Sequence, residues 1–307
     1  MAPDMRSAMI GAGFKDSTDN KQPKGQGKPA RPPQDRPRSG REKDPVRVLP
    51  LYKHLKDVRE FPGAPHPGLI FDKYPNIWSC NPNWKREDKA KNDFFECVIE
   101  YANSPEIGSY LTAHIDRHKE LVDNCGGEHR EFSTDWRFVT GLGMGHVIET
   151  GFVWHRTLGV PYLPGSSVKG MLRAWAECEL GRDGAKRIME LFGPNSDLRD
   201  SKSSAGRLIV FDALPSTRPK IELDVMNPHY SEYYMKDKPP ADYLSPVPIF
   251  FLAVASGQKF LFSLAPRPGA GTQDDVKEGM HLLVSALDQL GAGAKTSVGY
   301  GYMTEVK

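Results

Sequence analysis

The sequence predicts an α+β fold in which helices pack against an antiparallel sheet in the ferredoxin-like order. Two observations lead to this class. Segments whose apolar residues recur three and four positions apart alternate with short, glycine-bounded segments rich in β-branched and aromatic residues, and these are the patterns of amphipathic helices and of strands. From residue 131 onward the segments follow the order strand, helix, strands, hairpin, helix, strand, which is the order of a ferredoxin-like module.

Residues 1–47 have the composition of a flexible, disordered basic arm. They are rich in Pro, Gly, Ser and charged residues and have few large apolar side chains, so burial cannot offset the entropy lost on folding. The arm holds 11 of the 41 Lys and Arg and 6 of the 39 Asp and Glu, which leaves 30 and 33, a net charge of −3, for the remainder. The arm is either a solvated tail or a contact to RNA or to a neighbouring subunit.

Residues 48–130 predict an irregular and helical extension packed on the core. Prolines and aromatic residues fill its first part, and helices are expected at 88–102 and 105–124. His114 and His118 stand four residues apart on the second helix, a spacing that can bind a metal, but no third ligand is evident. We therefore expect a solvent-facing helical turn there and no metal site.

The domain at 131–307 contains the remaining elements, and two of its strands are predicted to form a hairpin through a short Ala-Ser-Gly turn. Strands are expected at 136–140, 147–155, 207–214, 221–225, 249–254, 258–264 and 298–304, and helices at 166–180, 183–192 and 274–290. The hairpin joins the strands at 249–254 and 258–264.

The helix that begins at Ser166 carries cations in an unusual place. Lys169 and Arg173 lie in its first two turns, although a helix N-terminus already has a partial positive charge. Ser166 or Ser167 is a natural N-cap, and the neighbouring free N–H groups can accept a phosphate. Gly170 inside the helix suggests a close approach by another backbone or a ligand. The alternative is a capped surface helix with scattered cations.

A second glycine-rich loop near the C-terminus offers similar chemistry. Gly291, Gly293, Lys295 and Thr296 resemble part of a Walker A motif, but alanine precedes the lysine where the motif requires glycine, and the loop leads from helix to strand. We therefore expect a turn that holds a backbone phosphate, and a nucleotide-binding module remains an alternative. Gly299 lies on a face of the predicted last strand that carries no side chain at this position. Either a ligand or a packed helix could approach this face closely. If both loops line one groove, they could together bind successive phosphates of a nucleic-acid backbone.

Two further features could contact or cleave RNA. His146 and His155 lie close in sequence, and an imidazole pair can catalyse acid–base cleavage, but the spacing implies neither an orienting carboxylate nor an oxyanion donor. We therefore expect His146 and His155 to be polar residues whose hydrogen bonds are satisfied within the protein. An aromatic-rich insertion at 223–245 separates two strands, and its aromatic rings could stack on unpaired bases. The alternative is a long loop packed on its own tyrosines.

Four motifs give the chain a likeness to a known family. GLGMGHVIETG at 141–151, GVPYLPGSSVKGMLR at 159–173, the insertion at 223–234 and GAGAKTSVGYG at 291–301 together resemble the RAMP superfamily of CRISPR proteins, and within it the sixth subunits of type III-B Cmr effector complexes. The resemblance covers about residues 132–304. It implies a ferredoxin-like (RRM-like) domain that holds the 3′ part of the guide RNA (crRNA) at one end of a multi-subunit filament, during antiviral RNA targeting.

The resemblance also implies that target cleavage belongs to other subunits. We thus expect a non-catalytic protein without cofactor or metal, whose partners are guide RNA, target RNA and other Cmr subunits. The alternative is an endonuclease that processes guide precursors with His146 or His155. The longest apolar run, 249–256, is only strand length, and no signal peptide is evident, so we expect a cytoplasmic protein. The residues expected to contact RNA are Ser166, Ser167, Lys169, Arg173, Gly291, Gly293, Lys295, Thr296, Gly299 and His146, with Asn227, His229, Tyr230 and Tyr233 in a thumb.

Overall fold

A computed structural model describes residues 47–48, 66–80, 84–194, 205–228, 233, 239 and 246–307. All of these residues belong to one compact unit, Pro45–Lys307. The predicted arm at 1–47 therefore lies outside the described residues, except for its last residue.

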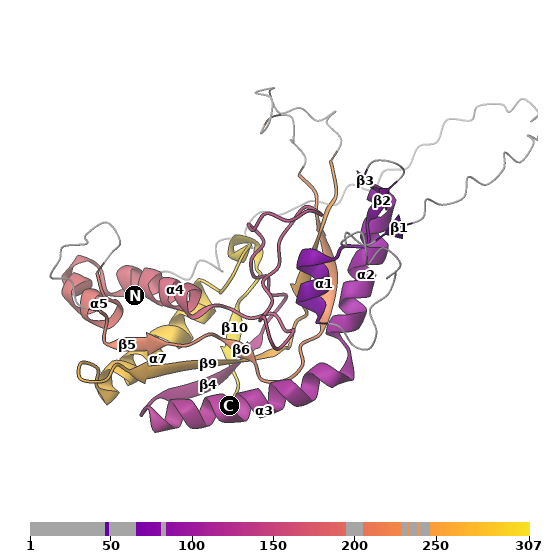
Figure 1. Ribbon diagram of the computed structural model, residues 1–307. Helices are drawn as coiled ribbons and strands as arrows, with labels where there is room; N and C mark the ends of the chain where they lie inside the picture. Colours follow the sequence, from indigo (N-terminus) through magenta and orange to yellow (C-terminus); the bar gives the residue numbers. More distant parts are fainter. Residues whose placement is uncertain are drawn as a thin grey trace, which may run out of the picture. The chain divides into compact units, whose positions relative to one another are not determined.

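The centre of this unit is an antiparallel sheet built around one long strand (Figure 1). Strand β9, Lys259–Pro266, pairs with β4, Glu128–Thr134, on one side, and with β5, Leu208–Val210, and β6, Leu214–Pro215, on the other. Strand β10, Met303–Glu305, pairs with the outer side of β4. The strand order is β10-β4-β9-β5. The sequence predicted neither the position of β4 nor its central role.

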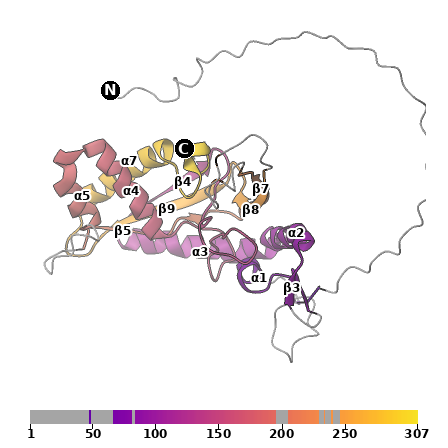
Figure 2. The same ribbon diagram turned by 90° about the horizontal axis from the view of Figure 1, so that it is seen from above.

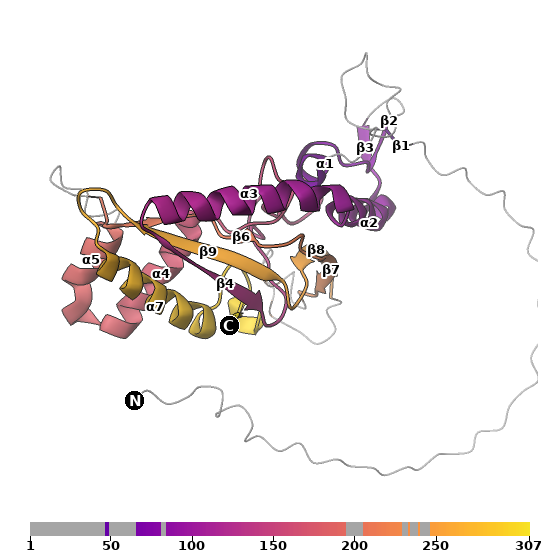
Figure 3. The same cartoon turned by 90° about the horizontal axis from the view of Figure 1, so that it is seen from below.

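Helices cover both faces of this sheet. Residues Phe260 to Ala265 of β9 are all buried, as expected for a strand with packed elements on both sides. Phe260, Phe262 and Leu264 belong to the main core together with residues of α4, Gly165–Leu180, and α7, Gln273–Gln289. Figures 2 and 3, from opposite sides, show α4 and α7 on one face and α3 on the other.

Helix α3, Pro105–Asn124, packs on the second face through a smaller cluster. Leu111 and Ile115 belong to this cluster together with Leu261 of β9. Successive side chains of a strand point to opposite faces of the sheet, so Leu261 faces α3 while Phe260 and Phe262 face the main core. His118 is half-buried on the same helix, and its Nε2 lies 3.1 Å from the Oγ of Ser263. The expected solvent-facing turn is thus wrong for His118, which packs onto the sheet. Among the described residues no cluster of His, Cys, Asp or Glu could hold a metal ion.

Smaller elements surround this layered core. They are β1, Arg47–Val48, α1, Pro67–Lys73, β2, Trp78–Cys80, β3, Trp84–Arg86, α2, Lys91–Ala102, and α5, Ala185–Phe192. The first three strands form a separate sheet, and α5 packs on α4. No helix in the described ranges is long and apolar enough to cross a bilayer.

The predicted hairpin between 249–254 and 258–264 is wrong. Strand β8, Ile249–Val254, pairs with β7, Ile221–Met226, in a second, two-stranded sheet, whereas β9 belongs to the main sheet. An isolated bridge pairs Val254 of β8 with Phe138, which follows the end of β4 at Thr134. The Ala-Ser-Gly segment between β8 and β9 is therefore a crossing from one sheet to the other.

Three other predicted strands are mostly irregular. In the segment 147–155, Ile148, Phe152 and Trp154 are buried against the core near Phe71 of α1, and Trp154 forms only an isolated bridge with Pro161. In the segment 298–304, Gly299 and Gly301 have φ of +100° and +75°, so the chain turns there and β10 begins only at Met303. The predicted strand at 136–140 is reduced to a single bridge at Phe138.

Candidate functional site

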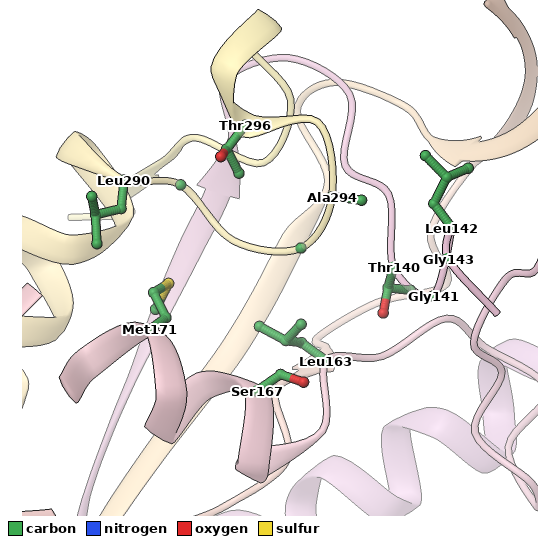
Figure 4. A pocket seen from close by; sticks show the side chains of 12 residues that line it. Thr140, Gly141, Leu142, Gly143, Leu163, Ser167, Met171, Leu290, Ala294 and Thr296 are labelled. Atoms are coloured by element: carbon green, nitrogen blue, oxygen red, sulfur yellow. The ribbon is translucent and has the colours of Figure 1, made fainter. Parts of the chain in front are cut away.

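Three segments far apart in the sequence meet around one pocket (Figure 4). They are residues 140–143, the first turns of α4, and residues 290–296 after α7, with Leu163 between the first two. The pocket has a volume of about 520 Å³. Of the residues predicted to contact RNA, Ser167, Gly291, Gly293 and Thr296 line it. The structure thus brings together the two loops that the sequence singled out.

The loop after α7 is shaped by its own backbone. Gly291 and Gly293 have φ of +70° and +82°, a region that glycine enters without steric cost. The N–H of Ala292 donates to the carbonyl of Gly301 at 2.8 Å. A Cβ at Gly301 would lie 1.9 Å from the oxygen of Ala292. The glycines at 291, 293 and 301 therefore fit the turn and its close pairing with the residues before β10.

The start of α4 differs from the prediction. The helix begins at Gly165 with Pro164 as N-cap, and no side chain of the cap residue bonds to it. The N–H of Gly165 donates instead to Oδ1 of Asp212 at 2.6 Å. Ser166 and Ser167 are exposed in the first turn, so neither is the N-cap. A carboxylate from the segment between β5 and β6 therefore supplies the anion expected at this helix end.

Lys169 and Arg173 lie on another side of α4 from the pocket. Ser167 and Met171 line the pocket. At about 100° per residue, Lys169 and Arg173 lie roughly 160° and 120° away from Ser167 around the helix axis. Arg173 donates from Nη1 to the carbonyl of Gly193 at 3.0 Å, and its Nε lies 3.2 Å from Glu177.

Lys169 lies in a cationic environment. Its pKa is lowered by burial first and then by the charges of Arg267 and Arg173. The described residues place no carboxylate within ion-pair distance of its ammonium group. The charges of Arg267 and Arg173 therefore act unfavourably on the ammonium group of Lys169. The contact of Lys169 and Arg173 with RNA stays a prediction, but they do not share the pocket with Ser167.

Lys295 is held on the strands of the second sheet. It has φ of +62°, the only left-handed conformation among the described non-glycine residues. Its Nζ lies 5.6 Å from the ring centre of Phe251 and 5.8 Å from that of Tyr300, which is cation–π distance. Lys295 does not line the pocket. Its predicted phosphate contact is not tested by this geometry.

Tyr300 anchors the same loop to β7. Its hydroxyl donates to Oδ2 of Asp224 at 2.6 Å, and Arg137 donates to the same oxygen at 2.9 Å. Burial and the hydrogen bond to Asp224 raise the pKa of Tyr300 to about 12. Gly299 lies beneath the ring of Trp136, since its added Cβ would be 3.5 Å from that ring. The predicted bare strand face at Gly299 is thus a turn covered by an aromatic side chain.

The two histidines considered for catalysis are bound within the protein. Nε2 of His146 lies 2.8 Å from the carbonyl of Phe71, and Nδ1 accepts the N–H of Ile148 at 3.3 Å. Nδ1 of His155 accepts the N–H of Leu158 at 3.3 Å. Burial lowers the pKa of both imidazoles, which favours their neutral forms. The two ring nitrogens of His146 already have partners.

The predicted thumb is described only in part. Asn227 follows β7 and is exposed, and Tyr233 is 48% exposed. His229 and Tyr230 lie outside the described residues. The insertion predicted from residue 223 starts inside β7, which extends to Met226. Sequence reasoning also missed Thr140, Asp212 and Asp224, because only the fold brings these residues to the two loops.

Comparison with known proteins agrees with this architecture. The model of the RAMP superfamily matches residues 129–304. The Cmr6 subunit of the CRISPR Cmr system of Pyrococcus furiosus is 30% identical over 231 residues, which cover 57% of this chain and 67% of that protein. The Cmr6 subunit of Saccharolobus solfataricus is 30% identical over 239 residues, with coverage of 74% and 77%.

A solved structure is similar as well. A chain in the cryo-EM structure of type III-B Cmr-β bound to cognate target RNA is 26% identical and superposes with a TM-score of 0.56, over 72% of this chain and 74% of that chain. The family match includes the three segments around the pocket and the helices α4 and α7, which cover one face of the sheet. From its motifs, its fold and these relatives, the chain belongs to the RAMP superfamily and is homologous to the Cmr6 subunits of type III-B CRISPR Cmr complexes.

Proposed function

We propose that this chain is a non-catalytic guide-RNA-binding subunit of a type III-B Cmr ribonucleoprotein. It holds the 3′ part of the crRNA at one end of the complex, next to other Cmr subunits and target RNA, in the cytoplasm. One observation carries the proposal: the pocket joins the first turn of α4 to the glycine loop after α7, two segments that the sequence indicated as RNA contacts. The homologous chain in an RNA-bound Cmr structure supports it.

The fold supports the ferredoxin-like assignment within this proposal. The elements β4, α4, β5, β9, α7 and β10 occur in the order βαββαβ, with α5 inserted after α4 and β6, β7 and β8 inserted between β5 and β9. This is the ferredoxin-like order with insertions. The first and third of these strands are central in the sheet. We place the RAMP domain at about residues 131–307, with β4 starting slightly earlier, the extension at 48–130 beside it, and an arm at 1–47.

In this function the cations beside α4 neutralise RNA phosphates. Burial lowers the pKa of Lys169 first, and the charges of Arg267 and Arg173 lower it further, so a phosphate there would relieve repulsion. Lys295 contacts the second sheet at Phe251, and Asn227 directly follows β7 of that sheet, where a thumb would meet the guide–target duplex. His146 and His155 act as structural residues, and the chain cuts no RNA.

Salt-dependent binding tests the phosphate contacts. The full chain, with Lys169→Ala plus Arg173→Ala, should bind labelled single-stranded RNA more weakly at all sequences alike. Two lost phosphate contacts should lower the slope of log K against log salt by about 1.4. Lys186→Ala plus Arg182→Ala, which removes two exposed cations near α5, is the matched control. An unchanged slope in the first variant, with folding verified by its melting curve, excludes those two residues.

A cleavage assay tests the absence of catalysis. Purified protein is incubated with labelled precursor RNA in EDTA, and the intact RNA should persist. Site-specific cuts that disappear in His146→Ala or His155→Ala would instead establish the endonuclease alternative.

A further inference from the structure

The pocket between the three segments has an uncharged lining. Thr140, Ser167 and Thr296 provide hydroxyl groups, and Leu163, Met171 and Leu290 provide apolar surface. Within the part of the chain that the structure describes, no Lys, Arg, Asp, Glu or His lines it. Pockets of roughly 300–1,000 Å³ with apolar walls and a few polar groups are typical of small-molecule sites, and this one has about 520 Å³. Its walls therefore suit a neutral group.

A phosphate fits this pocket poorly. Neither Lys169 nor Lys295 reaches its wall, and the nearest helix end is already bound by the carboxylate of Asp212. A charged group that loses water there would have no countercharge, which is strongly unfavourable. The backbone phosphates must lie outside the pocket.

Thr140 places a hydroxyl group at the pocket. The residue is only 2% exposed, and the described residues supply no hydrogen-bond partner for its hydroxyl. The oxygen is not one of the fully buried atoms without a partner, so it is open to the pocket. Figure 4 shows the oxygens of Thr140 and Ser167 on the sides that face the space between their segments. The hydroxyl of Thr140 is therefore available to whatever enters the pocket.

We propose that this pocket holds one unpaired nucleoside of the bound RNA through its uncharged base and ribose. The inference rests on the proposed guide-binding function and adds the chemistry of one contact. The apolar side chains of Leu163 and Met171 pack on the base, as in other sites that take up unstacked bases. The hydroxyls of Thr140 and Ser167 bond to base edges or to the ribose 2′-hydroxyl.

Gly143 offers a clean way to block the pocket. It lines the pocket, is exposed, and has no atom within 4 Å of an added Cβ. Its φ lies outside the left-handed region, so Gly143→Leu adds a large side chain at the pocket lining without backbone strain. Gly145 has the same open surroundings two residues later but does not line the pocket. Gly145→Leu is therefore the matched control, and Thr140→Val removes the hydroxyl while preserving shape.

The test measures the affinity of the full chain for one single-stranded RNA at several salt concentrations. Gly143→Leu should weaken binding about tenfold, as expected for losing a buried base, with the salt slope of wild type. Thr140→Val should weaken it about fivefold, through one lost hydrogen bond. Gly145→Leu should bind like wild type. Equal affinity of Gly143→Leu and Gly145→Leu overturns the nucleoside pocket and leaves the guide-binding function intact.

Chemically altered strands identify the bound part. The wild-type chain is titrated with the same strand as RNA, as DNA, and as RNA with abasic positions introduced one at a time. If DNA binds more weakly than RNA, the hydroxyls of Thr140 and Ser167 bond to the ribose. If the affinity falls when one position is abasic, the apolar walls of the pocket contact the base at that position. Equal binding of all strands overturns the proposal, as does a reduced salt slope in Gly143→Leu, which would mean a phosphate. If wild type binds no RNA at all, the proposed function itself is wrong.

Discussion

Removing the charge of Arg187 should destabilise the fold by about 2–3 kcal/mol. Its Nη2 lies 2.6 Å from Oδ1 of Asp275 and 2.5 Å from Oε2 of Glu278, and so joins α5 to the start of α7. The side chain of Asp275 is 2% exposed. Breaking a buried ion pair costs about 3–5 kcal/mol because a charge stays buried without its partner.

The structure places the effect below that range. Asp275 keeps two donors in any Arg187 variant, the backbone N–H and the hydroxyl of Thr272 at 2.8 and 2.9 Å. Arg207 stays 3.9 Å away, and Arg187 itself is 30% exposed. Arg187→Met retains the aliphatic stem and its packing, so the loss reports on charge. Lys186→Met, an exposed neighbour in α5, is the control.

The loss should depend on pH. Burial opposes the charged form of Asp275, but the hydrogen bonds from Thr272 and then Arg187 outweigh it and lower its pKa below 3.8. A lowered carboxyl pKa stabilises the fold above the unfolded value, and this contribution disappears as the pH falls through the folded value. Urea unfolding followed by tryptophan fluorescence should thus show the full difference at about pH 7 and a smaller one at about pH 3. A difference from Lys186→Met below about 0.5 kcal/mol, or one that persists unchanged in acid, would refute the reasoning.

Two further substitutions test helix α4 and the contact of Tyr300 with β7. Gly170→Ala should raise the free energy of unfolding by about 0.5–1 kcal/mol, because an added Cβ meets no atom within 4 Å and alanine loses less entropy in a helix; urea unfolding measures this, and a lower stability would contradict it. Asp224→Asn should lower the pKa of Tyr300 from about 12 toward 10, because the carboxylate charge no longer opposes ionisation. Tyrosine-labelled NMR titration, with Tyr300→Phe to assign the signal, checks this, and an unchanged value would exclude the hydrogen bond.

The helices were predictable because their signals are local. The expected helices at 105–124 and 274–290 correspond to α3 and α7 within one residue at each end. Each has a periodic apolar face and a clear start, the latter a capping box between Thr272 and Asp275. Such signals depend on residues a few positions apart and remain visible in a single sequence.

The strand pairing was less predictable because its partners are distant. The apolar runs 249–254 and 258–264 are adjacent and similar, so a hairpin was the simplest interpretation. Their actual partners, β7 and β4, are identified only by packing in the complete fold. The segment 147–155 alternates like a strand but is buried against α1. Burial imposes the same pattern as a sheet face would.

The candidate site was predictable in its segments but not in its charges. Glycine-rich stretches and the Gly-Ser-Ser step identified two of the three segments around the pocket. Three features of the site depend on residues far away in the chain. They are the side of α4 on which Lys169 lies, the carboxylate of Asp212 at the start of α4, and the aromatic contacts of Lys295. Sequence spacing alone gives no rotation of a helix about its axis relative to its neighbours.

The register of the β7–β8 pair has a consequence for how this family can vary. Met226 and Ile249 are directly paired at the outer end of that two-stranded sheet, and β9 completes the main sheet without it. Residues can therefore be added or removed between these two positions without shifting a ladder bond elsewhere, and doubling the length of a closed loop costs only about 0.6 kcal/mol. Homologues can accordingly exchange this segment for one of another length while the sheet and the pocket stay as they are.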